Sequence, residues 1–379
     1  MKLLSDDERN KMKKFLKIIS FLLLLLSIGK EIFAQTDSLR ANLEALPIFS
    51  YDSDVGFGYG GKLFLFDVIK TKESFDLILF NSTKGEQWYK FVFSIPDFES
   101  RHGKKFPISL DLVVEYDKFN KYYLYTMLYD FDITTGSMKL IEPKTETKYE
   151  KANLGIFLSK GFLKDFTGTI GLQFKSFSFY NVQDNPLIFY EYDRQRPEEK
   201  SYASLLLNCK WDARNSFINP KSGILAQFEL EYNGEMSSGS EKYIRMLLSF
   251  QYYKEIFVKN LIAAFRFRRE TTSLFDKSSV FSKIPIGGSS NLRGYPLDRY
   301  RFGEMILVNG ELRFPIWWKF GGIAGFDFAT GSVDEDFDNK NLINAVLGLR
   351  FFMDNFIVRA DLGLSKETTG LYLNFGHLF

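Results

Sequence analysis

The chain has 379 residues, of which 45% are hydrophobic and 17% aromatic, and its net charge is only +2. A charge this small excludes the basic field on which nucleic-acid binding depends, so we expect no nucleic-acid partner. The single cysteine, Cys209, excludes an internal disulfide, and two histidines, His102 and His377, leave little basis for a metal site. An aromatic-rich chain with a mean hydropathy of −0.15 fits an antiparallel β protein, including a membrane barrel with a wet lumen.

Residues 1–34 have the pattern of a secretory signal peptide. A lysine-rich segment precedes an apolar run, 18–28, that is too short to span a membrane. Phe33-Ala34-Gln35 after this run offers a small-residue cleavage point, so we expect cleavage after Ala34 and a mature protein that begins at Gln35. Acidic residues ahead of the lysines are unusual in a signal peptide, and a start at Met12 would give a more typical one.

Residues 35–54 are predicted to form a short periplasmic segment, and residues 55–379 an outer-membrane β-barrel. After the signal peptide no run of about 18 apolar residues remains, so no transmembrane helix is predicted. Segments of roughly ten residues instead alternate apolar and polar side chains between turn signals, which is typical of a transmembrane barrel. The alternation predicts sixteen strands, at 55–66, 74–82, 87–95, 107–116, 121–131, 150–159, 166–180, 201–213, 223–234, 241–253, 256–268, 303–314, 320–330, 342–353, 355–365 and 369–379.

The connections between these strands differ in length with their position. Long connections follow odd-numbered predicted strands, notably 132–149, 181–200 and 269–302, whereas those after even-numbered strands are mostly short. Bacterial barrels carry long loops outside and short turns on the periplasmic side. We therefore expect both termini in the periplasm and the connection 269–302 at the outer end.

The turn after the strand at 201–213 has a distinctive composition. Asp and Asn side chains can bond nearby backbone, while Pro and Gly set the geometry of a turn. The residues concerned are Asp212, Arg214, Asn215, Pro220 and Gly223. Both a purely structural turn and a family motif fit this pattern.

The long connection before the strand at 303–314 contains Gly287 and Gly288, followed by Arg293, Gly294 and Tyr295. Glycines permit backbone conformations that side chains forbid, so this loop can fold back tightly. The Arg293 guanidinium offers a rigid fork of donors, and inside a barrel it would need an acidic partner. The alternative is a surface turn with a solvated arginine.

An acidic partner for Arg293 is available on the strands that follow. Alternation places Asp327 on the face opposite Phe326, which points it into the lumen. Glu311 and Asp361 are predicted to face inward as well, and they remain the alternative partners.

The chain ends in a predicted strand that contains Phe375, His377 and Phe379. A terminal aromatic residue on such a strand is similar to the C-terminal assembly signal of bacterial outer-membrane barrels. His377 stands where an aromatic residue is more usual.

Several of these patterns occur together in one known group of proteins. The glycine pair, the Arg-Gly-Tyr tripeptide and the downstream Glu-Leu-Arg-Phe-Pro at 311–315 resemble the BamA/TamA-like, or bacterial surface antigen, superfamily of outer-membrane barrels. The turn at 212–223 and the Gly-rich stretch at 321–327 extend the resemblance to roughly 205–379. The resemblance implies that the Arg293 loop folds into the lumen and that an Asp of the strand at 320–330 pairs with it. About twenty residues before the first predicted strand are too few for the periplasmic POTRA domains of this superfamily, which indicates a barrel-only branch.

The resemblance also implies a function, which is the insertion of barrels into the Gram-negative outer membrane or the export of polypeptides across it. The implied partners are outer-membrane lipid, client barrels or exported polypeptides, and the assembly machinery that inserts the chain itself. Four glycines in the first predicted strand, at 56, 58, 60 and 61, would weaken its seam with the last. A passive channel or structural surface barrel, with the loop as a plug, is the alternative.

A barrel enzyme is the third possibility for this sequence. Both histidines lie far in sequence from the Arg293 loop, which argues against a surface protease or lipase. We expect no catalytic residue, no cofactor and no metal ligand.

Overall fold

The computed structural model describes residues 43–101, 104–125, 128–132, 137–141, 144–180, 199–237, 241–274, 280–332, 339–353 and 356–379. The predicted signal peptide lies outside these ranges. The chain divides into two units, Met1–Glu44 and Ala45–Phe379, and the barrel from Ala45 onward is the second.

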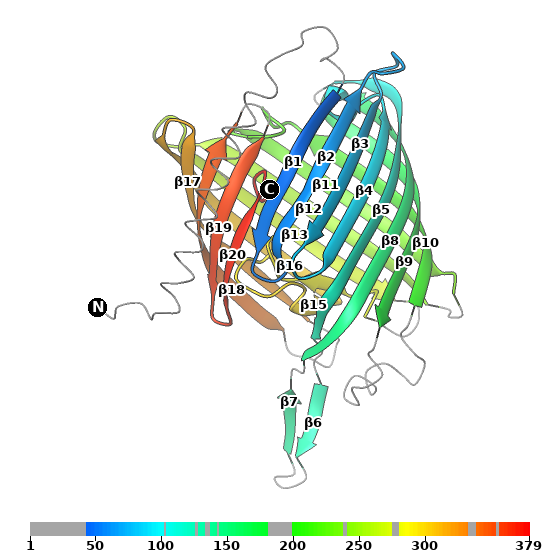
Figure 1. Cartoon of the computed structure of the whole chain (residues 1–379), viewed down its shortest axis with the longest axis vertical. Helices are drawn as coiled ribbons and strands as arrows, with labels where there is room; N and C mark the ends of the chain where they lie inside the picture. The colour runs from blue at the N-terminus through cyan, green and yellow to red at the C-terminus, as the bar shows by residue number, and fades with distance from the viewer. Residues whose placement is uncertain are drawn as a thin grey trace. The chain divides into compact units, whose positions relative to one another are not determined.

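Sixteen antiparallel strands close a barrel in which each strand pairs with the next and the last pairs with the first (Figure 1). The strands are β1 (Leu43–Asp52), β2 (Gly56–Phe66), β3 (Ser74–Ser82), β4 (Glu86–Ile95), β5 (Phe106–Tyr125), β8 (Lys144–Leu163), β9 (Phe166–Tyr180), β10 (Glu199–Asp212), β11 (Gly223–Glu235), β12 (Lys242–Glu255), β13 (Ile262–Leu274), β16 (Glu304–Trp317), β17 (Phe320–Ser332), β18 (Lys340–Phe352), β19 (Ile357–Ser365) and β20 (Thr369–Phe375). The predicted fold class, an all-β antiparallel barrel of sixteen strands, is confirmed.

Four short strands lie outside the barrel wall. Strands β6 (Leu128–Asp132) and β7 (Ser137–Ile141) pair in the connection between β5 and β8, and β14 (Ile284–Ile286) pairs with β15 (Tyr300–Phe302) between β13 and β16. The helix α2 (Phe98–Arg101) is a single turn between β4 and β5. Among the described residues, no helix has the length and apolar character needed to cross a membrane.

Two errors in the predicted strands cancel in the count. Strand β1 lies in the stretch 35–54 that was predicted to be a periplasmic segment, so the glycine-rich strand is the second and not the first. Pro47 obscures β1 in the sequence, yet proline is tolerated in a strand at a sheet edge. The predicted strand 107–116 and the first part of 121–131 form the single strand β5, whose middle is polar and whose register shifts at a bulge after Phe119.

The predicted strand 256–268 is also displaced, because the chain turns at 256–261 before β13 begins at Ile262. Phe257 and Asn260 adopt φ values of 56° and 65° in this turn. Left-handed conformations are rare for an aromatic residue, so the sequence carried no turn signal at Phe257.

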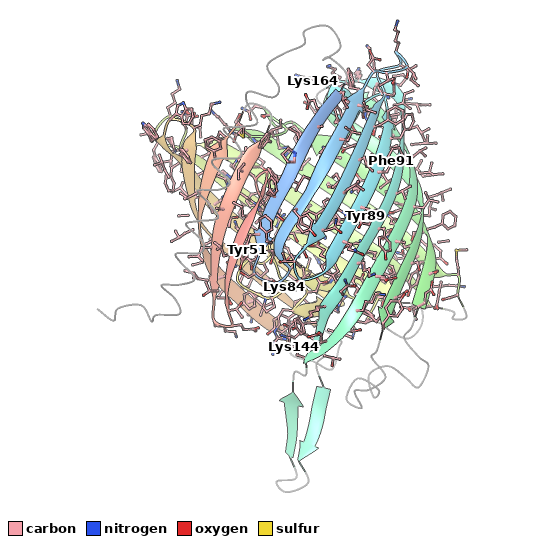
Figure 2. The ribbon with its side chains drawn as sticks, in the orientation of Figure 1. Tyr51, Lys84, Tyr89, Phe91, Lys144 and Lys164 are labelled. Carbon is pink, nitrogen blue, oxygen red and sulfur yellow. The ribbon has the colours of Figure 1, made fainter. Side chains whose placement is uncertain are left out.

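The two ends of the barrel are different. The end that holds the long connections 126–143, 181–198 and 275–303 is named the loop end here, and the opposite end is the turn end. Because the two errors in the predicted strands cancel before the first of these connections, each connection still follows an odd-numbered strand of the barrel. The three connections therefore lie at one end, as predicted. Figure 2 shows Lys84 and Lys144 at the loop end and Lys164 at the turn end.

The two faces of the wall differ in polarity. Outward side chains such as Leu154, Ile156 and Leu172 are exposed, whereas inward side chains such as Gln173 and Glu231 are buried. An apolar outer face around a polar interior is the arrangement of a membrane barrel. The alternation along each strand therefore fixes which charged residues can meet in the lumen.

Candidate functional site

The connection that contains Arg293 lies inside the barrel. Asp298 accepts a hydrogen bond from Tyr122 Oη of β5 at 2.6 Å, while Arg293 reaches Asp327 of β17. Because β5 and β17 lie in different halves of the strand order, one loop can contact both only from the lumen. We call residues 287–301 the lumen loop.

Arg293 is fully buried, and its guanidinium meets three carboxylates at once. Its Nη2 lies 2.8 Å from Asp327 Oδ1, and its Nη1 lies 2.9 Å from both Glu311 Oε1 and Asp361 Oδ2. Nε and the backbone N–H of Arg293 also donate to Asp327 Oδ2, at 3.0 and 3.1 Å. All three carboxylates that the sequence offered as possible partners therefore contact the arginine. Asp327 forms the largest number of hydrogen bonds with it.

The three carboxylates differ in their other partners. Glu311 also pairs with Arg313 Nε at 2.9 Å, and Asp361 also pairs with Arg350. Asp327 instead accepts bonds from the amides of Asn309 and Asn344, at 2.7 and 3.0 Å. Among the described residues, Arg293 is the one cation that forms an ion pair with Asp327.

Two glycines allow the loop to approach the wall. Gly294 has a φ of 84°, a conformation that favours glycine, and its backbone lies directly against Gly363 of β19. A Cβ on Gly363 would lie 2.5 Å from the Gly294 nitrogen and 2.6 Å from the Arg293 carbonyl carbon. Backbone contact between loop and strand therefore sets the depth at which Arg293 meets its partners.

The rest of the motif anchors the loop by apolar packing. Tyr295 is fully buried, and its hydroxyl donates to the Ile343 carbonyl at 3.2 Å. It belongs to an apolar cluster with loop, β14–β15 and inward wall residues: Ile284, Ile286, Leu292, Tyr300, Phe302, Met305, Leu307, Ala329 and Leu342. Gly287 and Gly288, with φ of 129° and 88°, turn the chain into this cluster.

Sequence reasoning missed four residues of this site. Asn309 and Asn344 hold Asp327, Gly363 receives the loop tip, and Tyr372 Oη accepts the Gly294 N–H at 2.9 Å. All four lie on strands at inward positions, so alternation could have placed them in the lumen. Nothing in the sequence pairs them with a particular loop residue.

The seam between β1 and β20 is short. Among the described residues, two pairs join these strands, Tyr51 with Leu373 and Asp52 with Tyr372, against seven pairs between β19 and β20. Ser53 adds hydrogen bonds to the Leu371 backbone at the loop end. The barrel is therefore closed at this place by much less backbone pairing than between its last two strands.

The pairing with β1 stops at Leu373, two residues before β20 ends, and the chain beyond β20 does not extend it. The predicted strand 369–379 stops at Phe375, and Gly376, with a φ of 76°, turns residues 376–379 into the lumen. If the register at Tyr51–Leu373 continued for six residues, Phe379 would lie opposite Ala45. The segment that could have covered the start of β1 lies elsewhere, which corrects the prediction of a terminal strand.

The inward turn is explained by what Phe379 contacts. Its ring packs with Tyr253 and Ala264 and lies 5.2 Å from the guanidinium carbons of Arg266 and Arg313. Cations over an aromatic face in a partly desolvated site are a favourable arrangement. Of the predicted assembly signal, Phe375 stays in the strand, while His377 and Phe379 leave it.

The turn between β10 and β11 is held by its own polar residues. Arg214 forms a two-point pair with Asp212 at 2.8 Å for each bond, and Asn215 Oδ1 accepts the backbone N–H groups of residues 221 and 222. Gly223 has a φ of 111°, and a Cβ there would lie 2.3 Å from the Ala213 carbonyl oxygen. These contacts show that the motif residues stabilise the turn itself.

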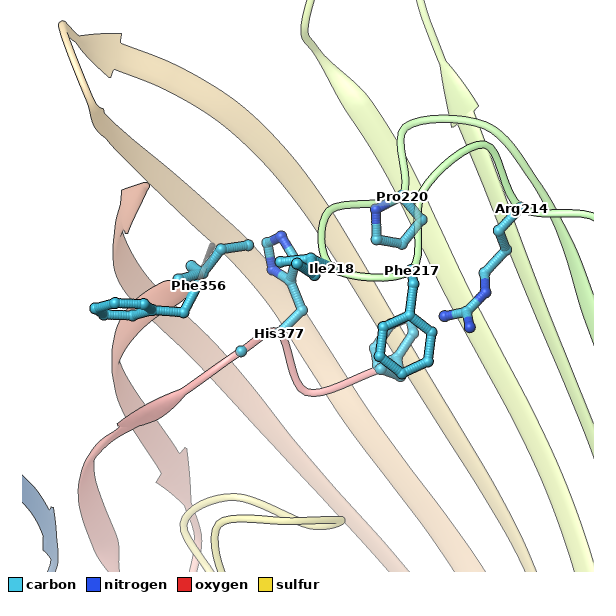
Figure 3. A pocket seen from close by; sticks show the side chains of 9 residues that line it. Arg214, Phe217, Ile218, Pro220, Phe356 and His377 are labelled. Carbon is cyan, nitrogen blue, oxygen red and sulfur yellow. The ribbon is translucent and has the colours of Figure 1, made fainter. Parts of the chain in front are cut away.

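This turn also meets the C-terminal tail across the turn end. His377 Nε2 lies 3.1 Å from Asn219 Oδ1, and its Nδ1 lies 3.4 Å from Arg350 Nε. Since Arg350 can only donate, the ring is neutral with its proton on Nε2. Figure 3 shows the pocket of about 240 Å³ between turn and tail, lined by Arg214, Phe217, Ile218, Pro220, Phe356, Ile357, Gly376, His377 and Phe379.

The docking of the tail is expected to depend on pH. Burial, with the charges of Arg313 and Arg350, holds the pKa of His377 well below its usual range. A released tail would return His377 to a pKa of about 6.5, so protons favour release. Docking is therefore complete above that pH and weakens below it, by at most about tenfold per pH unit. Hydrogen exchange of residues 374–379, corrected for the intrinsic effect of pH, should rise between pH 8 and pH 5.

A matched variant separates His377 from other titrating groups. His377→Gln keeps an acceptor for Arg350 and a donor for Asn219 but does not titrate. The corrected hydrogen-exchange rate of its tail should be the same at pH 5 and pH 8. A wild-type tail that is equally protected at pH 5 and pH 8 would contradict the assignment.

A second cavity, of about 580 Å³, lies in the lumen between the turn end and the middle of the barrel. Acidic and basic side chains both line it, including Arg101, Lys175, Lys210, Glu229 and Glu270. Toward the loop end, wall and connection residues form a buried apolar cluster: Phe119, Tyr122, Leu124, Phe179, Tyr202, Tyr243, Val280 and Phe281. Within the described residues, no group of His, Cys, Asp and Glu is placed to hold a metal ion.

The sequence and fold were compared with those of known proteins. Residues 77–348 match the Omp85 superfamily domain. BamA from Haemophilus ducreyi lacking POTRA domains 1–3 is similar in fold, with a TM-score of 0.63 and 12% identity over 89% of this chain and 70% of that chain. CdiB from Acinetobacter baumannii has a TM-score of 0.54 and 12% identity, and CdiB from Escherichia coli has 0.59 and 11%.

Each CdiB match covers 90% of this chain but only 61% and 64% of the respective CdiB chains. A search of the curated proteins found no match. At these identities the solved structures establish the fold, while the domain match extends over well more than half of the sequence. The chain belongs to the Omp85 superfamily.

Proposed function

We propose that this protein works in the Gram-negative outer membrane, where it inserts client barrels into the membrane or exports polypeptides across it through the seam between β1 and β20. The observation that carries the proposal is the shortness of this seam, which has two residue pairs. The superfamily membership and the resemblance to BamA and CdiB support it.

The physical basis is the free edge of β1. The part of β1 before Tyr51 has no pairing with β20 in the described structure, and residues 376–379, which turn inward, do not cover it. Unpaired N–H and C=O groups along a strand edge are a template on which an extended chain can add as a new strand. Pro47 removes one donor from this edge. A client that is itself rich in β-strands would suit such a template.

A passive channel plugged by the lumen loop is the second candidate. The lumen cavity of about 580 Å³ favours it, since water and small ions fit there. The apolar cluster and the lumen loop oppose it, because both fill space inside the barrel toward the loop end. An enzymatic role is not proposed, and neither is a cofactor.

A disulfide across the seam tests the proposal. In a Cys209→Ser background, Tyr51→Cys with Leu373→Cys joins two residues that face one another across the seam. Locking the seam should lower insertion of a client barrel into vesicles by at least about tenfold, and a reductant should restore it. The matched control is Leu207→Cys with Leu230→Cys, which joins β10 to β11 and should leave insertion unchanged.

The disulfide variant of the seam also distinguishes between the two candidate functions. If the locked and reduced forms insert clients equally well, the seam is not the route. If vesicles show steady conductance and no insertion under either condition, the channel is the correct function.

A further inference from the structure

The lumen loop is bonded to the β20 side of the seam through its tip. The Gly294 N–H donates to Tyr372 Oη at 2.9 Å, and Tyr372 is one of the two β20 residues that pair with β1. The Gly294 carbonyl accepts bonds from Ser365 Oγ and Thr368 Oγ1, at 2.7 and 2.6 Å. The last hairpin of the barrel is thus fastened to one loop residue.

Three residues later the same loop is bonded to the β1 side. The Leu297 N–H donates to Asp54 Oδ2 at 2.9 Å, in the turn that joins β1 to β2. The loop then returns to the β20 side, where Arg299 Nε lies 2.7 Å from Glu367 Oε2. A short stretch of loop therefore crosses the seam twice.

These contacts are concentrated where the seam itself is paired. The two residue pairs and the Ser53 bonds lie at the loop end, and the loop bonds to Asp54, Glu367 and Tyr372 lie at the same end. Toward the turn end β1 has no pairing with β20 in the described residues. The bonds from the loop outnumber the residue pairs that they accompany.

We infer that the lumen loop is a clamp that holds β1 and β20 together from inside the barrel, so that the seam opens fully only when the loop is released. The inference deepens the proposed function and rests on it, because the proposed function is what requires the seam to open. The loop is itself held by Arg293 on Asp327, Glu311 and Asp361. A signal that reaches the loop can therefore act on the seam.

Thermodynamic linkage makes the coupling reciprocal. If release of the loop favours an open seam, then opening the seam must favour release of the loop to the same extent. A client strand that adds to the edge of β1 would loosen the loop, and a ligand that fixes the loop would keep the seam closed.

Hydrogen exchange of the seam tests the clamp without a client. Asp54→Ala removes the acceptor on the β1 side and leaves the Arg293 cluster intact. We expect exchange at residues 51–53 and 371–373 to rise about tenfold, which corresponds to about 1.4 kcal/mol. Asp54→Asn keeps an acceptor oxygen and should stay within about twofold of the wild type. Arg293→Ala, which acts from the loop, should also raise exchange at the seam.

Two controls make the result decisive. Asp97→Ala removes a turn carboxylate that accepts the Ser100 N–H at the opposite end, and it should leave the seam unchanged. With the disulfide between positions 51 and 373 closed, Asp54→Ala should no longer raise exchange there.

Unchanged seam exchange in Asp54→Ala, or a freed loop with a protected seam in Arg293→Ala, would overturn the clamp. Exchange is read in the absence of clients, so a failed insertion assay would contradict the proposed function and not this inference.

Discussion

Replacing Arg293 with alanine is expected to release the lumen loop from the barrel wall. The substitution leaves three buried carboxylates without the cation that they share. Breaking a buried ion pair by removing one partner typically costs about 3–5 kcal/mol, since a charge is left uncompensated. The expected readout is rapid tryptic cleavage after Arg299 and Arg301, which lie in the released segment, while the barrel strands stay resistant.

The consequences differ among the three carboxylates. Glu311 keeps Arg313, and Asp361 keeps Arg350, but Asp327 loses its one ion-pair partner among the described residues. Most of the penalty should therefore fall on Asp327. Adding Asp327→Asn to Arg293→Ala removes that charge and should restore part of the protease resistance. Asp327→Asn alone should be milder than Arg293→Ala, because Arg293 retains two carboxylates.

Two further variants define the chemistry at this position. Arg293→Lys should rescue only partly, since an ammonium cannot reproduce the fork that meets three carboxylates from three nitrogen donors. Arg269→Ala is the matched control, because it breaks an exposed pair with Glu304, where both side chains are about half exposed. Exposed pairs contribute about 0–1 kcal/mol, so that variant should behave as the wild type. Equal sensitivity of the two arginine variants would contradict the buried cluster.

Part of the Arg293 site was visible in local and periodic features of the sequence, while the place of the loop in the lumen was implied by the family resemblance. The glycines that let the loop fold back lie within a few residues of Arg293, and strand alternation placed Asp327, Glu311 and Asp361 on the inward face. The choice among three carboxylates could not be made from the sequence. It depends on the stagger of β16, β17 and β19, which brings all three to one guanidinium.

The errors have a common cause, which is tertiary contact that overrides local pattern. Strand β1 contains a proline and borders the seam, so it lacks the clean alternation of a central strand. The C-terminal tail alternates like a strand, yet Arg266 and Arg313 draw Phe379 into the lumen. Neither arginine is near Phe379 in the sequence, and nothing local at Gly376 distinguishes a turn from a strand glycine.

Gly363→Ala is expected to displace the lumen loop although it removes no charge and no hydrogen bond. The new Cβ would lie 2.5 Å from the Gly294 nitrogen and 2.6 Å from the Arg293 carbonyl carbon. Both are backbone atoms, which cannot rotate away as a flexible side chain can. The loop tip must move outward, and the Arg293 bonds at 2.8–3.1 Å must lengthen with it. Overpacking of this kind costs about 1–3 kcal/mol before any loss of ion pairing.

Gly363→Ala tests the close approach of loop and strand without adding backbone strain. Gly294→Ala would combine both effects, because Gly294 has a φ of 84°, whereas Gly363 has no left-handed φ. Gly234→Ala on β11 is the matched control, since a Cβ there would meet no atom closer than 3.7 Å. The control should keep the tryptic pattern of the wild type, and Gly363→Ala should approach that of Arg293→Ala.

The double variant decides whether the glycine contact and the ion cluster hold the same closed state. If they do, Gly363→Ala should add little to Arg293→Ala, because the loop is already displaced when the second change is made. Strictly additive effects would mean that Gly363 supports the barrel independently of the loop. A Gly363→Ala protein whose loop stays fully resistant to trypsin would show that the strand can yield at this point, and that the depth of Arg293 is set by its carboxylates alone.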